Sequence, residues 1–261
     1  MVSKLVNTIT FSKKRENLLL LLKDGPRTLE EIRNSLNVTS SGMIPQIRKL
    51  EEQKLVRQEG KMYMLTDTGT VIAEVFSSFI KTAEIIESYP DFWELHEMRA
   101  VPQHLLKRIY ELGDCRLIES KISDIYEPHK EFMKYIMNTK QFIGIAPVFH
   151  QTYPALFLRL AENGTDVSII LTRNVYDKTQ KEHADVIKKF IRLENAQLFK
   201  SNDDIRLASA VMDNFFSMSF FFKNNGYDSM NELVSSNNTA IRWGEELFDY
   251  FVEKSSRIKS L

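Results

Sequence analysis

Small polar and basic side chains gather in residues 39–56, TSSGMIPQIRKLEEQKLV. Hydroxyl groups and helix N–H groups suit phosphate oxygens, whereas amide and guanidinium groups can reach the edges of bases. Met43, Ile47 and Leu50 recur at helical spacing and are expected to face inward. The residues left for the outer face and its flanks are Ser40, Ser41, Ile44, Pro45, Gln46, Arg48 and Lys49. These side chains form the candidate contact surface for a duplex.

Pro45 is unusual in such a helix. If the helix starts at Ser40 or Ser41, the proline falls in its first or second turn, and a missing N–H deeper in a helix costs about 3 kcal/mol. Ile44, which precedes the proline, is biased away from helical angles. We therefore expect a bent or irregular helix start. Either Ile44 and Pro45 make apolar contacts, for example with a thymine methyl group, or Pro45 only fixes the turn.

Two further helices and a hairpin are expected around this stretch. Ser12 can cap a helix that Gly25 and Pro26 end, and Thr28 with Glu31 has the spacing of a capping box for the next one. A turn at residues 59–60 then joins two short strands, residues 55–58 and 62–66. Helix, helix, turn, helix and hairpin is the order of a winged helix-turn-helix.

The phrase LEEQKLVRQEGKMYMLTDTG resembles the recognition-helix end and the wing of many winged-helix transcription regulators, and LTDTG is especially typical of them. The resemblance implies double-stranded DNA as the partner, with Lys61 and Tyr63 as wing contacts. Three basic residues at the start of the first helix would hold the flanking backbone: Lys13, Lys14 and Arg15. The alternative is a protein-interaction adaptor whose winged helix does not read DNA.

The charge balance favours neither reading strongly. The chain has 35 basic and 35 acidic residues, and residues 1–88 have 13 Lys and Arg against 11 Asp and Glu. A neutral total provides no global positive field. Any affinity for DNA must therefore come from local placement of charge.

A long helix is expected from about residue 67, with a wide apolar stripe. The stripe consists of Val71, Ile72, Val75, Phe76, Phe79, Ile80 and Ala83. It can form a homodimer that reads two half-sites, or it can simply link two domains. The sequence around Tyr89 and Pro90 breaks the pattern, so we predict a DNA-binding domain in residues 1–88 and a sensor or assembly domain in residues 92–261.

The second domain is predicted to be an α/β sheet, which makes the whole chain α+β or α/β in class. From residue 140 onward, strands and helices alternate as β-α-β-α-β, and three antiparallel strands and a last helix follow. In FFSMSFFFK, Phe216, Met218, Phe220 and Phe222 fall on one face of a strand. Ser217 and Ser219 fall on the other face, which either lines a pocket or packs under a helix.

A small-molecule effector is a further expected partner. The carboxyl ends of strands in α/β sheets often hold ligands, which makes His150 and Arg173 candidates, although both can also be solvated loop residues. Asp213 lies just before the serine face described above. The candidate ligand-binding residues are His150, Arg173, Asp213, Ser217 and Ser219.

No pattern for catalysis or a cofactor is recognised. The strand order weakly resembles a phospholipase D-like sheet, but the catalytic signature of that class has a lysine two residues after a histidine. None of the five histidines has one. The P-loop, GxSxG, GxGxxG and HExxH patterns are also missing, so we expect no enzyme, metal or cofactor. Cys115, the lone cysteine, is read as a small buried hydrophobe or, alternatively, a redox-sensing thiol.

The phrases VPQHLLKRIYELGDCRLIE, EPHKEFMKYI, DNFFSMSFFF and RWGEELFDYF are more specific. They resemble a family of archaeal regulators, known chiefly from methanogens, with an N-terminal winged helix and a methanogenesis regulatory protein middle domain. The resemblance covers essentially the whole chain and implies a transcription regulator. The apolar run at residues 18–22 is too short for a signal sequence or a membrane span, so we expect a cytoplasmic protein without a membrane partner.

Overall fold

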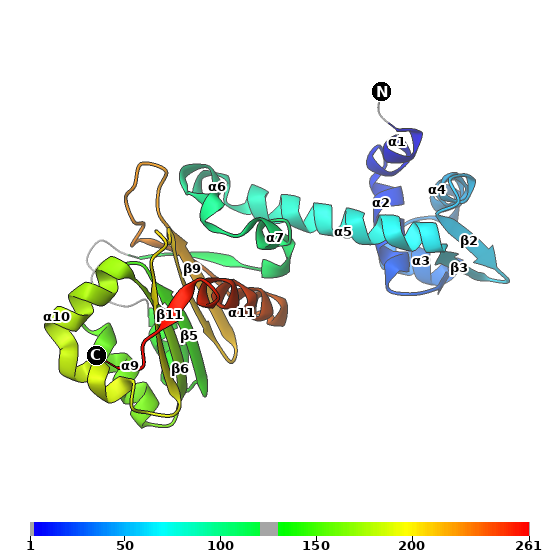
Figure 1. Cartoon of the computed structure of the whole chain (residues 1–261). Helices are drawn as coiled ribbons and strands as arrows, with labels where there is room; N and C mark the ends of the chain where they lie inside the picture. The colour runs from blue at the N-terminus through cyan, green and yellow to red at the C-terminus, as the bar shows by residue number, and fades with distance from the viewer. Residues whose placement is uncertain (1–2, 121–129, 261) are drawn as a thin grey trace. The chain divides into compact units, whose positions relative to one another are not determined.

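A computed structural model describes residues 3–120 and 130–260 of the chain (Figure 1). The chain divides into two compact units, Met1–Lys81 and Thr82–Leu261. The division falls inside the long helix α5, so each unit contains part of that helix. The fold is mixed: a winged helix-turn-helix is followed by an α/β unit, which confirms the predicted fold class.

The N-terminal unit is built from helices around a small sheet. Its helices are α1 (Lys4–Thr10), α2 (Lys13–Lys23), α3 (Leu29–Leu36), α4 (Ser40–Glu52) and α5 (Asp67–Ser88). Its strands are β1 (Arg27–Thr28), β2 (Val56–Glu59) and β3 (Met62–Leu65), in the order β1-β3-β2. The helix α1 was not expected from the sequence.

Local signals set the helix boundaries in this unit. The Thr28 side chain accepts from the Glu31 N–H and the Glu31 carboxylate accepts from the Thr28 N–H, so the predicted capping box forms at the start of α3. Asn37 ends α3 in the left-handed conformation, which asparagine tolerates better than most residues. Thr39 caps α4 by accepting from the Gly42 N–H at 3.2 Å.

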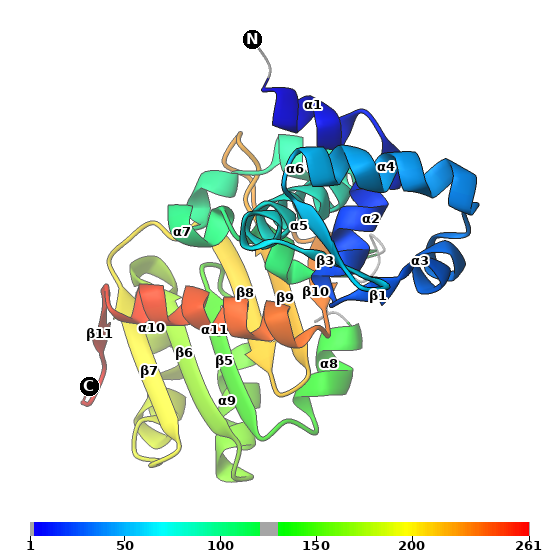
Figure 2. The same cartoon turned by 90° about the vertical axis from the view of Figure 1, so that its right-hand side faces the viewer.

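The C-terminal unit is an eight-stranded sheet with helices on both faces (Figure 2). Its strands are β4 (Arg116–Glu119), β5 (Gln141–Ala146), β6 (Asp166–Thr172), β7 (Ala196–Ser201), β8 (Leu207–Met212), β9 (Phe215–Phe220), β10 (Asn231–Ser235) and β11 (Ser255–Arg257). Their order is β11-β7-β6-β5-β8-β9-β10-β4. Among the strands of the described residues, β5, β6 and β7 pair in parallel, as the predicted β-α-β-α-β run requires, and β8, β9 and β10 are the predicted antiparallel additions.

Helices cover the two faces of this sheet with separate cores. The helices before the sheet are α6 (Pro90–Leu95), η1 (Met98–Ala100), α7 (Gln103–Leu106) and η2 (Ile109–Leu112). Those that follow are α8 (Lys130–Ile136), α9 (Tyr153–Glu162), α10 (Arg173–Phe190) and α11 (Asn238–Val252). The core under α11 contains Trp243, Leu247 and Phe248, and the core on the other face contains residues of α8, α9 and α10.

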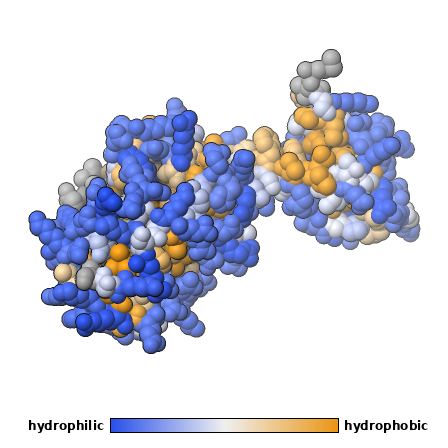
Figure 3. All heavy atoms as spheres, in the orientation of Figure 1, coloured by the Kyte–Doolittle hydropathy of each residue, from blue (hydrophilic) through white to orange (hydrophobic). Residues whose placement is uncertain are grey.

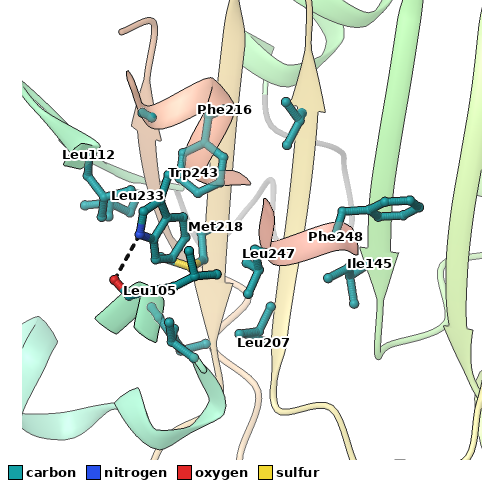
Figure 4. Packing of buried hydrophobic residues seen from close by; sticks show 14 of the residues in the cluster. Leu105, Leu112, Ile145, Leu207, Phe216, Met218, Leu233, Trp243, Leu247 and Phe248 are labelled. Atoms are coloured by element: carbon teal, nitrogen blue, oxygen red, sulfur yellow. Dashed lines mark hydrogen bonds between the residues drawn. The ribbon is translucent and has the colours of Figure 1, made fainter. Parts of the chain in front are cut away.

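Trp243 occupies the centre of the first core (Figure 4). Its side chain is fully buried, and its indole N–H donates to the carbonyl oxygen of Leu105 at 3.0 Å. The ring meets Phe216 of β9 edge-on, with ring centroids 5.8 Å apart. A buried tryptophan needs such an acceptor for its N–H group, so this bond fixes α7 against α11.

Candidate nucleic-acid interface and ligand cavity

The exposed face of α4 carries part of the expected contact surface. Ser41, Pro45, Arg48 and Lys49 are exposed, while Met43, Ile47 and Leu50 are buried, as the spacing predicts. Ser40 and Ile44 are half-buried. The helix is continuous across Pro45, so the expected irregular start is not observed. A proline removes a single N–H donor, and the rest of the helix retains its own hydrogen bonds.

Gln46 and Arg15 are engaged inside the N-terminal unit. Arg15 is 7% exposed, and its guanidinium group donates to the Gln46 side-chain oxygen at 2.7 Å and to the carbonyl oxygen of Thr8. Ser12 Oγ lies 3.5 Å from the same Gln46 oxygen. Arg15 therefore joins α1, α2 and α4 and does not present its charge to a phosphate. Sequence spacing gave no sign of this pairing, because the partners are far apart in the chain.

Lys14 lies beside the first turn of α4 instead. Its ammonium group would lie 3.0 Å from a Cβ atom placed on Gly42. Gly42 and the exposed hydroxyl of Ser41 therefore adjoin a positive charge at a helix N-terminus, where the N–H groups already favour an anion. Lys13, in contrast, is paired with Glu16 at 3.1 Å.

The wing presents Lys61 more fully than Tyr63. Lys61 is exposed next to Gly60, whose φ of 59° makes the tight turn between β2 and β3. Tyr63 is half-buried against the core of the unit and pairs with Arg27 across the sheet. The wing also carries an ion pair between Arg57 and Glu59 at 2.9 Å. Of the two predicted wing residues, Lys61 is therefore exposed and Tyr63 is not.

The helix α5 carries an uncovered apolar stripe. Val71, Val75 and Phe79, spaced four residues apart, are 64%, 66% and 62% exposed. Phe11, just after α1, is 78% exposed. Figure 3 shows hydrophobic atoms gathered over α1, α2 and α5. Ile72 and Phe76 pack on the core of the unit, so one helix carries both an inner and an outer apolar face.

A cavity of about 510 Å³ lies on the α9 and α10 side of the large sheet. Small side chains on three neighbouring strands make room for it: Gly144 pairs with Ala210, and Ala210 pairs with Ser217. Ser219 continues the same face of β9, while Phe216, Met218 and Phe220 enter the opposite core. The serine face therefore lines a pocket, one of the two interpretations that the sequence left open. An adjoining apolar recess adds about 50 Å³.

The cavity contains several buried polar groups. Glu232, on β10, is 9% exposed and brings a carboxylate to the wall. Burial, reinforced by Glu232, raises the pKa of Tyr153 and of Tyr227, so both phenols keep their protons at neutral pH. Tyr227 is also hydrogen-bonded to Ser219. Glu232 and the two tyrosines were not singled out in the sequence, because nothing in their local pattern distinguishes them from core residues.

The remaining predicted ligand residues are divided between this cavity and other places. His150 lines the cavity, and its ring stacks on Tyr153 with centroids 4.2 Å apart. Arg173 begins α10 and donates to the Asn202 side chain at 2.9 Å, so it does not end a strand at the cavity. Asp213 lies in the β8–β9 turn, where it accepts from the backbone N–H groups of Lys140 and Gln141. Arg173 and Asp213 are not among the residues that line the cavity.

His96 has a structural partner. It is 2% exposed; its Nδ1 lies 2.6 Å from the carbonyl oxygen of Phe92, and its Nε2 lies 3.0 Å from the carboxylate of Asp228, which is also 2% exposed. His129 lies outside the described residues. Within the described part of the chain, no three His, Cys, Asp or Glu side chains are grouped to hold a metal ion.

Burial raises the pKa of the Cys115 thiol to about 11, and its side chain packs against the α11 core.

The two units thus define a winged helix-turn-helix protein with an α/β sheet domain that contains a cavity. In sequence, residues 3–84 match the family model for the N-terminal domain of the methanogenesis regulatory protein FilR1, and residues 125–254 match the model for its middle domain. The chain belongs to this family, as its sequence phrases predicted. A curated relative, methanogenesis regulatory protein FilR1 of Methanothrix harundinacea, is 22% identical over 98% of this chain. The chain spans 58% of the length of that relative.

Solved structures show more distant likeness. The archaeal chromatin protein TrmBL2 is similar over 96% of this chain and 97% of its own, with 13% identity and a TM-score of 0.44. Nuc from Salmonella typhimurium, a phospholipase D family member, is similar over 56% of this chain and 99% of its own, with 15% identity and a TM-score of 0.39. In the described residues, no helix has the length and apolar character needed to cross a membrane.

Proposed function

We propose that the protein is a DNA-binding transcription regulator that binds as a homodimer and whose C-terminal unit senses a small molecule. The exposed face of α4 supports the first part, because Ser41, Arg48 and Lys49 lie together on a capped helix. Lys14 and Lys61 add positive charge beside the helix start and at the wing tip. Membership of the family supports the regulatory role, since the curated relative is named a regulatory protein.

The proposal is tested by fluorescence anisotropy of the purified protein with its own upstream DNA and with a scrambled duplex. A regulator is expected to prefer its own duplex at physiological salt, and its affinity should fall steeply as salt rises, because bound phosphates release counterions. Absence of binding to any duplex, even at low salt, would favour the protein-interaction adaptor instead.

Replacing Arg48 with alanine is expected to weaken binding to the specific duplex by about 1–3 kcal/mol, roughly five- to 150-fold, if its guanidinium group contacts a base edge. Binding to the scrambled duplex should change much less. Arg242→Ala provides the control, because it removes an exposed arginine from the C-terminal unit. Equal weakening on both duplexes would make Arg48 a phosphate contact and leave base reading to other residues.

The dimer part of the proposal rests on the stripe of Val71, Val75 and Phe79. Contiguous exposed apolar side chains are typical of protein interfaces, and a second copy would cover the stripe by the same residues under two-fold symmetry. A two-fold dimer also presents two copies of α4 to a two-fold DNA site. We therefore infer that a second copy of this chain covers the stripe, because the same dimer would also present two α4 helices to the DNA.

Val75→Glu is expected to convert a dimer into a monomer and to weaken specific DNA binding by more than tenfold, because it places a charge in the centre of an apolar interface. Light scattering coupled to size-exclusion chromatography measures the mass. Thr70→Glu adds the same charge at an exposed position of α5 that lies away from the stripe, and it should leave the dimer intact. Monomeric wild-type protein at micromolar concentration would refute this part of the proposal.

A further inference from the structure

The lining of the cavity changes from apolar to polar across the large sheet. The strands that contribute to it follow one another in the order β6-β5-β8-β9-β10 (Figure 2). Ile169 of β6 and Ala146 of β5 line one end, which the adjoining apolar recess extends to Leu198 of β7. Ser217 and Ser219 of β9 line the other end. A ligand that lies across the strands therefore meets apolar side chains at one end and hydroxyl groups at the other.

Aromatic rings add to the apolar part of the wall. Phe142 stacks on Phe157 with ring centroids 4.9 Å apart, and it meets Phe132 edge-on with centroids 6.2 Å apart. Phe149 also lines the cavity, but its ring already has a partner, because Lys178 Nζ lies 4.3 Å from its centroid. The packed group of the other three rings offers a large apolar surface to a ligand.

The carboxylates at the cavity are engaged within the protein. Asp228 accepts from the N–H group and the side chain of Asn231 and lies 3.0 Å from the His96 ring. Glu232 likewise has interactions of its own. None of the described lining residues is a lysine or an arginine. A buried charge is costly unless an opposite charge pairs with it, so this lining favours an uncharged ligand.

The size and the hydroxyl groups of the cavity define the ligand further. A volume of about 510 Å³ is within the range of small-molecule sites. Tyr227, hydrogen-bonded to Ser219, adds another hydroxyl at the polar end. We infer that the cavity binds an uncharged molecule with an apolar, ring-containing end over β6 and a hydrogen-bonding end over β9 and β10. The inference deepens, and rests on, the proposed sensing role of the C-terminal unit.

Isothermal titration calorimetry of the full chain tests the inference with three probes that share one naphthalene ring. The probes are naphthylmethanol, naphthoate and naphthylmethylammonium, substituted at the same ring position, so that they differ mainly in charge. Naphthylmethanol is expected to bind, and to bind more tightly than either ion by about tenfold or more, because the ions must be buried without a free partner. No heat with naphthylmethanol, or equal affinity for either ion, would overturn the inference.

Two variants test whether the probe occupies the cavity. Ala210→Leu puts a larger side chain between Gly144 and Ser217 on the sheet wall and is expected to weaken naphthylmethanol binding by about tenfold or more. Ala155→Leu, at an exposed position of α9, is the matched control and should bind like the wild type. Unchanged affinity in folded Ala210→Leu would overturn the inference.

Ser217→Ala tests the polar end and also decides the matter if Ala210→Leu fails to fold. Loss of the hydroxyl is expected to weaken naphthylmethanol binding by about threefold or more, the effect of one hydrogen bond. The same affinity as in the wild type would contradict the proposed placement of the hydrogen-bonding end over β9.

Anisotropy with and without naphthylmethanol distinguishes this inference from the proposed function. If the probe binds in the calorimeter and DNA affinity does not change, the cavity binds the predicted class of ligand but the sensing role fails. If the protein binds no duplex at all, the proposed regulator fails, while the calorimetry still decides what the cavity binds.

Discussion

Replacing Asp228 with alanine is expected to destabilise the C-terminal unit by about 3 kcal/mol or more, because each buried donor left without an acceptor costs about 1–3 kcal/mol. The Asp228 carboxylate accepts from His96 at 3.0 Å, from the N–H groups of Met230 and Asn231, and from the Asn231 side chain at 2.8 Å. Alanine would leave all of these donors without an acceptor in a place that is 2% exposed. Urea denaturation followed by tryptophan fluorescence measures the loss.

A graded variant separates charge from hydrogen bonding at this position. Asp228→Asn keeps a side-chain oxygen for the backbone donors and should cost less than the alanine variant. Asp249→Asn, at an exposed position of α11, is the control and should change stability little. If Asp228→Ala proved as stable as the wild type, the pair would contribute nothing to holding α6 against the β9–β10 connection.

The same group predicts a pH dependence. Burial alone would raise the pKa of Asp228, but hydrogen bonds from His96, from Asn231 and from the backbone N–H groups outweigh it and lower that pKa. A carboxyl group with a lowered pKa in the folded state stabilises the fold above its ordinary pKa, about 3.9, and loses this contribution as the pH falls through the lowered value. The stability difference between wild type and Asp228→Asn should therefore be present at neutral pH and shrink under strong acid. A difference that grows on acidification would contradict the assignment.

Gly69→Ala is expected to destabilise the N-terminal unit by about 3 kcal/mol or more, at the upper end for overpacking, because the obstacle is backbone. A Cβ atom on Gly69 would lie 1.9 Å from the carbonyl oxygen of Leu55. That oxygen accepts from the Thr66 N–H at 3.0 Å, which joins the end of β3 to the segment before β2. The glycine of the LTDTG phrase is thus required by the close approach of α5 to the wing.

Hydrogen exchange measures this effect, because protection of the backbone N–H groups should fall in the N-terminal unit and stay unchanged in the C-terminal unit. DNA affinity should fall as well. Gly42→Ala is the matched control for stability. Its Cβ would meet only the end of the flexible Lys14 side chain and the Thr39 hydroxyl, at 3.0 and 3.2 Å, and alanine favours a helix over glycine by about 1 kcal/mol. Equal protection in Gly69→Ala and the wild type would show that the wing shifts at little cost.

The sequence by itself determined the local elements and the family. The capping box at Thr28 and Glu31, the alternation of Phe216 with Ser217 and the parallel strand run were all readable, because hydrogen-bonding caps and side-chain periodicity depend on neighbours in the chain. The longer phrases around Trp243 and Phe216 were specific enough to indicate the family, which the family models confirm.

Only the tertiary structure decided which groups meet. Arg15 and Gln46 are 31 residues apart and looked free for DNA, but they bond to each other inside the N-terminal unit. The cavity exists because Gly144, Ala210 and Ser217 lie side by side on three strands. Glu232, on the next strand of the same sheet, and two tyrosines complete its lining, and no local pattern marks them. Periodicity says which face of an element is buried, whereas cross-strand register and helix packing decide which side chains share that face. The set of side chains that line the cavity therefore depends on cross-strand register and helix packing.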